Sequence, residues 1–120
     1  MEAASAEREI RAARNQAMFR YVNEQIVGLD ATFGPSPRAG AVACECADLT
    51  CVQLLEIPRR EYESVRQSPR TFVVLPTHVF PEVERVVATE GTYAVVEVIG
   101  EGIRVAEETD PRNEASATHG

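Results

Sequence analysis

All the cysteines of this 120-residue chain, three in number, lie in the eight-residue stretch CECADLTC at positions 44–51. Alternate side chains of an extended strand share a face. Cys44 and Cys46 are therefore expected on one side and Glu45 on the other, where its replacement should leave stability unchanged. A tight turn after Cys46 would bring Cys51 back beside them. Three thiolates would then occupy three corners of a tetrahedron, at about 2.3 Å from a zinc ion. The spacing predicts a hairpin that is closed by a metal.

A structural zinc site needs a fourth ligand, and the chain has two histidines. His78 lies in the stretch LPTHVFP, where prolines restrict the backbone. His119 lies in a polar segment near the end of the sequence. We therefore predict a Cys3His zinc site formed by Cys44, Cys46, Cys51 and His78. Asp48 or a water molecule is the alternative fourth ligand, and buried reduced thiols or a disulfide are the alternatives to a metal.

The strongest helical signal is EIRAARNQAMFRYVNEQIVGL at 9–29, within a predicted helix over 9–33. Large apolar residues recur there at spacings of three and four, which is typical of an amphipathic helix. They are Phe19, Val22, Ile26 and Leu29, followed by Phe33. This stripe would either pack on the chain's own sheet or form a seam with another chain. We predict its first four members as partner-binding residues, for a protein partner or a second copy. The stretch GPSPRAG at 34–40 predicts a loop.

The remaining pattern predicts a compact, zinc-stabilised α+β domain over residues 41–109. Short apolar or β-branched runs predict strands at 41–47, 52–57 and 71–75, and a hairpin formed by 82–89 and 92–99. The segment 58–68, with a proline in its first turn, predicts a short helix. The segment 100–110 fits either a short helix or a strand. This element order implies mostly antiparallel pairing. Residues 1–8 and 110–120 carry few large apolar side chains and are predicted to be a flexible N-terminus and a disordered tail.

The charge and the hydropathy of the chain restrict its partners. A net charge of −7 disfavours nucleic acid, whose binding depends on Lys and Arg. The stretch PRREYESVRQSPR at 58–70 carries four arginines, so binding of nucleic acid through this segment stays an alternative. The first twenty residues lack the apolar core of a signal peptide, and no apolar run is long enough to span a membrane. We therefore expect a cytoplasmic protein without membrane contact, in a compartment where thiols stay reduced.

Two resemblances bear on the metal. The Cys-x-Cys-x4-Cys spacing is similar to the zinc clip that follows SET methyltransferase domains, a likeness of eight residues that implies the metal and no activity. Over residues 15–112, the motifs CECADLTC, EYESVRQSPRTFVVLPTH, PEVERVV and YAVVE resemble a family of small uncharacterised bacterial proteins from GC-rich genomes. That family shares Cys-x-Cys-x4-Cys and a strand that ends in Pro-x-His, and the resemblance implies no activity. This chain departs from it in the turn before His78, where the family tends to have a glycine.

We expect a non-catalytic, zinc-stabilised interaction or regulatory module rather than an enzyme. A catalytic zinc keeps an open position and a nearby general base. Glu45, Asp48 and Glu82 are the carboxylates available for that task. Three thiolates, however, already neutralise much of the ion's charge, and no hydrolase, phosphate-binding or dinucleotide motif occurs. A small zinc enzyme and a nucleic-acid-associated factor are the alternatives.

Overall fold

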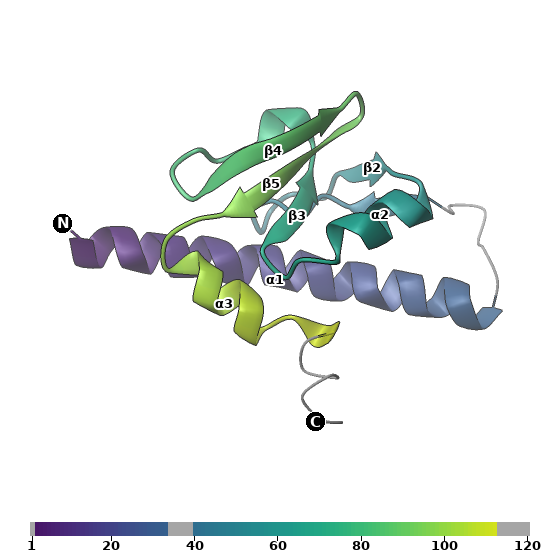
Figure 1. Ribbon diagram of the computed structural model, residues 1–120, viewed down its shortest axis with the longest axis horizontal. Coiled ribbons are helices and arrows are strands. Elements are labelled where there is room, and N and C mark those ends of the chain that lie inside the picture. The colour runs from purple at the N-terminus through teal and green to yellow at the C-terminus, as the bar shows by residue number, and fades with distance from the viewer. Residues whose placement is uncertain (1, 34–39, 113–120) are drawn as a thin grey trace.

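The chain folds into an α+β structure in which a long N-terminal helix lies beneath two small antiparallel sheets (Figure 1). The computed structural model describes residues 2–33 and 40–112. The elements run α1 (Glu2–Phe33), β1 (Ala41–Ala43), β2 (Leu54–Glu56), α2 (Arg59–Val65), β3 (Thr71–Val74), η1 (Pro76–His78), β4 (Glu84–Glu90), β5 (Tyr93–Val98) and α3 (Gly102–Glu108). In the described ranges no helix is both long and apolar enough to cross a bilayer.

The larger sheet has the strand order β3-β5-β4 and is antiparallel throughout. Its central strand β5 alternates Tyr93, Val95 and Glu97 with aliphatic residues, and all but one of its side chains are buried. Phe72 of β3 lies opposite Val96 and is fully buried. These β-branched and aromatic residues fit a strand that is covered on both faces. The sheet therefore forms the centre of the main hydrophobic core.

The smaller sheet is the β1-β2 hairpin, with Val42 opposite Leu55. The chain after β1 runs on beside the open edge of β3. There the Glu45 N–H donates to the carbonyl of Val73, and the Leu75 N–H donates to Cys44 Sγ. The predicted strand over 41–47 is thus a strand of three residues followed by an extended segment. That segment joins the two sheets and carries two of the predicted ligands.

Helix α1 packs on the sheets through small and polar side chains. Its buried residues recur at spacings of one, three and four, and they are Ala12, Ala13, Gln16, Arg20 and Asn23. Arg20 donates to the carbonyls of Pro69 and Ala106 and lies over the ring of Phe72, 4.5 Å from its centroid. The predicted apolar stripe does not face the sheets. Val22 and Leu29 are exposed, and Phe19 and Ile26 are half-buried.

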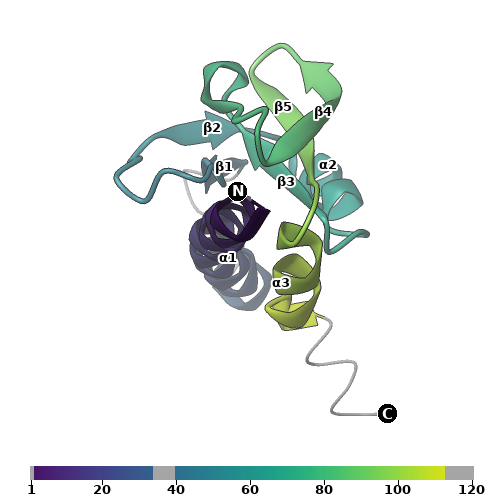
Figure 2. The same cartoon turned by 90° about the vertical axis from the view of Figure 1, so that its left-hand side faces the viewer.

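Helix α3 lies beside α1, below the end of β5 (Figures 1 and 2). Gly102 permits the close approach, since a Cβ at this position would lie 3.3 Å from both the Ala13 Cβ and the Glu9 carbonyl. After α3, buried Asp110 accepts a hydrogen bond from Arg66, and Arg112 pairs with Glu24. The segment 100–110 therefore forms a helix, which was one of its two predicted states.

Several predicted boundaries differ from the structure. Helix α1 begins at Glu2, so residues 2–8 are helical where a flexible N-terminus was predicted. Residues 110–112 are held by ion pairs, whereas the disordered tail was predicted to start at 110. Strand β4 begins at Glu84, later than predicted, and it ends at Glu90 after a β-bulge at Val87. Residues 34–39 of the loop predicted at 34–40, His119 and the rest of 113–120 lie outside the described residues.

Candidate metal centre

Three separate segments bring the four predicted ligands together. Cys44 and Cys46 lie on the extended segment after β1, and Cys51 lies on the return path before β2. A tight turn joins them, in which the Cys51 N–H donates to the Asp48 carbonyl. His78 ends the 3-10 helix η1, which follows β3 and begins at a proline. Its N–H donates to the Leu75 carbonyl and so closes that turn. The described structure thus brings together a hairpin loop and a loop 27 or more residues further on.

The ligand atoms of Cys44, Cys46, Cys51 and His78 all lie within 4.8 Å of one another. The Sγ atoms of Cys44 and Cys51 are each 3.6 Å from His78 Nδ1. A tetrahedral ion with the usual metal–sulfur and metal–nitrogen distances for zinc puts sulfur and nitrogen about 3.6 Å apart. These four residues are therefore close enough to hold a metal ion, and the fourth member of the cluster is His78 rather than Asp48.

The sulfur atoms lie in surroundings that suit a bound cation. Cys44 and Cys46 are buried, whereas Cys51 and His78 are half-buried. Burial raises the pKa of the Cys44 and Cys46 thiols, and the nearby Cys51 raises each pKa further. A cation removes that penalty, because it neutralises the thiolates it binds. The Leu75 N–H, 3.2 Å from Cys44 Sγ, is a donor that stabilises a thiolate. All three cysteines are free of disulfides.

Glu45 points away from this cluster, as strand alternation predicts, but it points into the protein. It is fully buried and accepts hydrogen bonds from the Asn23 amide, the Tyr62 hydroxyl and the Val73 N–H. Burial raises the pKa of Glu45, and these three hydrogen bonds oppose the rise. Asn23 also holds both backbone groups of Ala43. Glu45 therefore fastens the ligand-bearing segment to α1, α2 and β3.

Asn23 is a structural residue that apolar periodicity misses. The available signal was a second stripe on α1, in which Gln16, Arg20, Asn23 and Val27 recur at spacings of four, three and four. From the sequence alone, polar residues at helical spacing indicate a solvent-exposed helix face, because their partners are not known. Here the partners come from β1, β4 and α3.

The two other carboxylates considered as general bases lie outside the cluster. Asp48 is exposed, and its Oδ1 accepts hydrogen bonds from the N–H and the hydroxyl of Thr50. These bonds lower the pKa of Asp48. Glu82 is exposed and pairs with Arg8 at 3.2 Å. Both residues hold local structure around the ligand loops.

Comparison of the chain with protein-family models, with curated proteins and with solved structures finds no match. The family resemblance noted in the sequence therefore stays a prediction. The geometry of the site and the chemistry of its surroundings carry the functional argument.

Proposed function

We propose that this protein is a non-catalytic, zinc-stabilised interaction or regulatory module of the cytoplasm. The observation that carries the proposal is the set of four protein ligands whose donor atoms lie within 4.8 Å of one another. Three thiolates and an imidazole are a donor set that zinc prefers, and four protein ligands leave a tetrahedral ion no open position. Zinc held in this way contributes its binding free energy to folding.

The three carboxylates considered as general bases make other contacts, which favours a structural role of the metal over catalysis. A zinc hydrolase needs a carboxylate within reach of a metal-bound water. The carboxylate of Glu45 is engaged by three donors on the far side of the segment, and Asp48 caps its own turn. Glu82 pairs with Arg8. None of these three groups is directed at the four ligands.

The arginines at 58–70 give little support to a nucleic-acid role. Arg66 is buried and pairs with Glu24 and Asp110. Arg70 pairs with Glu107. Binding to a phosphate backbone requires exposed positive charge along one face. The segment instead uses at least two of its four arginines, Arg66 and Arg70, for contacts within the protein.

Metal analysis of protein purified without chelator tests the proposal, and about one zinc per chain is expected. Chelation should then lower the melting temperature of the wild-type protein. Cys46→Ser and His78→Ala should each reduce zinc content and stability, because each removes one ligand. Asp48→Ala, in the same loop, is the matched control and should keep the zinc. Substitution with cobalt gives a second readout, since its visible spectrum reports thiolate ligation.

Two outcomes would contradict the proposal. One is a metal-free protein that stays folded with an unchanged melting temperature. The other is a Cys46→Ser protein that keeps its melting temperature but loses a measurable hydrolytic or transfer activity. The second result would move the metal from a structural to a catalytic role.

A further inference from the structure

Helix α1 has its polar side turned inward and an apolar side turned outward. The side that packs on the sheets carries Gln16, Arg20 and Asn23. We define the outer face of α1 by five residues on the opposite side, namely Arg11, Arg14, Met18, Val22 and Leu29. Met18 is 60% exposed, Val22 45% and Leu29 58%. The ordinary arrangement of a surface helix is the reverse. Large apolar residues grouped on an exposed helix face are typical of a binding surface.

The basic end of this face carries charge without a partner. Among the residues that the structure describes, neither Arg11 nor Arg14 makes a hydrogen bond or an ion pair. Most other described arginines are paired with carboxylates, namely Arg8, Arg66, Arg70, Arg85, Arg104 and Arg112. Exposed Glu7 lies one helical turn before Arg11, so these three side chains together form a local positive region of one net charge, in a chain of net charge −7. That region favours a partner with acidic side chains.

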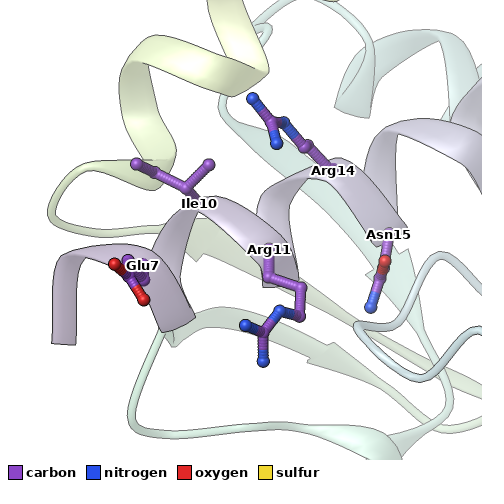
Figure 3. Close-up of a pocket in the computed structure, with 5 residues that line it drawn as sticks. All are labelled: Glu7, Ile10, Arg11, Arg14 and Asn15. Atoms are coloured by element: carbon purple, nitrogen blue, oxygen red, sulfur yellow. The ribbon is translucent and has the colours of Figure 1, made fainter. Parts of the chain in front are cut away.

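The surface around these arginines is hollowed. A depression of about 400 Å³ is lined by Glu7, Ile10, Arg11, Arg14 and Asn15 (Figure 3). A second one of about 240 Å³ lies between Arg11 and Phe80 and includes Val83 in its wall. In Figure 3 the side chains of Arg11 and Arg14 start from neighbouring turns of the helix and diverge from each other. Guanidinium groups that diverge suit two separate carboxylates better than one small anion.

A second copy of the chain fits this face less well. Parallel packing of two α1 helices would place the arginines of one copy against those of the other. Antiparallel packing would place them against the Val22–Leu29 end of the face. The described side chains of the outer face at that end carry no acid. Glu24 lies on another side of the helix, where it pairs with Arg66 and Arg112.

We propose that the outer face of α1 binds an amphipathic helix of a partner protein. That helix carries acidic side chains opposite Arg11 and Arg14 and aliphatic side chains opposite Met18, Val22 and Leu29. The inference rests on the proposed function, because it names the partner of the interaction module. Helices recognise one another in this way through anchors at i, i+3, i+4 and i+7, with charges that fix their register. Met18 and Val22 are spaced by four residues and supply the central anchors.

Photo-crosslinking with the full chain tests this inference. The benzophenone amino acid p-benzoylphenylalanine replaces Val22 in one variant and Val52 in another, and each is expressed in cells of the source organism. Val52 is 86% exposed on the loop between Cys51 and β2, so it samples a different surface. Position 22 should give one major adduct, whose crosslinked peptide maps to an acidic amphipathic helix.

Charge reversal then tests the contact with the purified partner. Arg14→Glu should weaken binding about fivefold to tenfold, and a Glu→Lys change in the partner should restore part of that loss. Arg60→Glu is the matched control, because Arg60 is exposed on α2 and has no partner in the described ranges. Its affinity should equal that of the wild type, and zinc content should be unchanged in both variants.

The contrary outcomes separate this inference from the proposed function. An adduct of two copies of the chain at position 22, or no adduct there, would overturn it. An adduct from Val52 alone would also overturn it, while the interaction module would stand with its surface at the metal loop. A confirmed partner on α1 together with a zinc-free, fully folded protein would leave the docking surface standing and remove the metal from the proposed function.

Discussion

At the scale of single residues, Glu45 lies between two candidate metal ligands and stabilises the fold through its own buried side chain. Its carboxylate accepts hydrogen bonds from Asn23 at 2.8 Å, Tyr62 at 2.9 Å and the Val73 N–H at 3.1 Å. Its own N–H donates to the Val73 carbonyl. Because β3 has no strand on that edge, the Glu45 side chain completes the pairing of Val73. These contacts predict a loss of stability on replacement of Glu45, whereas the sequence predicted no change.

Glu45→Ala should lower the free energy of unfolding by about 3 kcal/mol, because it leaves buried donors without an acceptor. Urea unfolding measures the effect. Asp48→Ala, on the exposed turn, is the control and should change stability little. Zinc content should stay at the wild-type value in both variants, since neither residue is a ligand. Equal unfolding midpoints for the two variants would contradict the prediction.

Glu84 is a second buried carboxylate, and its contribution depends on pH. Gln16 and the Phe80 N–H donate to it, but burial raises its pKa above the usual range for glutamate. Between the ordinary pKa and the raised one, the unfolded chain has released this proton while the folded chain retains it. Stability from Glu84 is therefore present below that window and is lost as the pH rises through it.

Glu84→Gln should remove this dependence. Relative to wild type, the variant's melting temperature should rise as the pH increases above the ordinary glutamate pKa of about 4.3. The amide introduced by this substitution can still accept from the Phe80 N–H. It can also donate to Gln16 Oε1, which has no partner in the wild-type structure. Glu82→Gln, at an exposed neighbouring position, is the control. A melting-temperature difference that stays constant from acid to neutral pH would contradict the assignment.

At the scale of elements, the orientation of α1 is the feature that apolar periodicity could not predict. The strands at 71–75 and 92–99 and the helix at 58–68 are near their predicted places, because β-branched runs and proline punctuation act locally. The buried side of α1 depends on partners far away in sequence. Arg20 is buried because Pro69 and Ala106 offer carbonyls, and Asn23 because Ala43 does. No local pattern identifies those partners.

Replacement of Asn23 tests how α1 is attached to β1. It accepts from the Ala43 N–H at 2.8 Å and donates to the Ala43 carbonyl at 2.9 Å, and thus pairs with β1 as a neighbouring strand would. Asn23→Ala should cost about 2 kcal/mol of unfolding free energy, because it leaves a backbone N–H and C=O unpaired. Gln25→Ala, on the exposed side of the same helix, should cost much less. Similar costs for the two would mean that Asn23 does not hold the helix.

At the scale of the whole molecule, the candidate metal site and α1 belong to one connected structure. The ligands join the β1-β2 hairpin to the loop after β3. Between Cys44 and Cys46, Glu45 joins the same segment to Asn23. The cysteine spacing and the single histidine between prolines predict the cluster, because cysteine and histidine can be recognised as metal-binding residues from the sequence alone. These sequence features do not reveal the connection to α1, because it depends on the buried side chain of Glu45, which faces away from the cysteines.

Withdrawal of the metal should therefore affect α1 as well as the ligand loops. Without the ion, the segment at 44–46 loses its fixed position, and the Glu45 carboxylate no longer holds Asn23 in place. Hydrogen exchange with and without chelator should show faster exchange at 44–51 and 73–79, and also at 16–27 of α1. The β4-β5 hairpin, which is paired within its own sheet, should change least. Faster exchange that is confined to the ligand loops would show that the metal stabilises only its own neighbourhood, and that α1 is held independently of it.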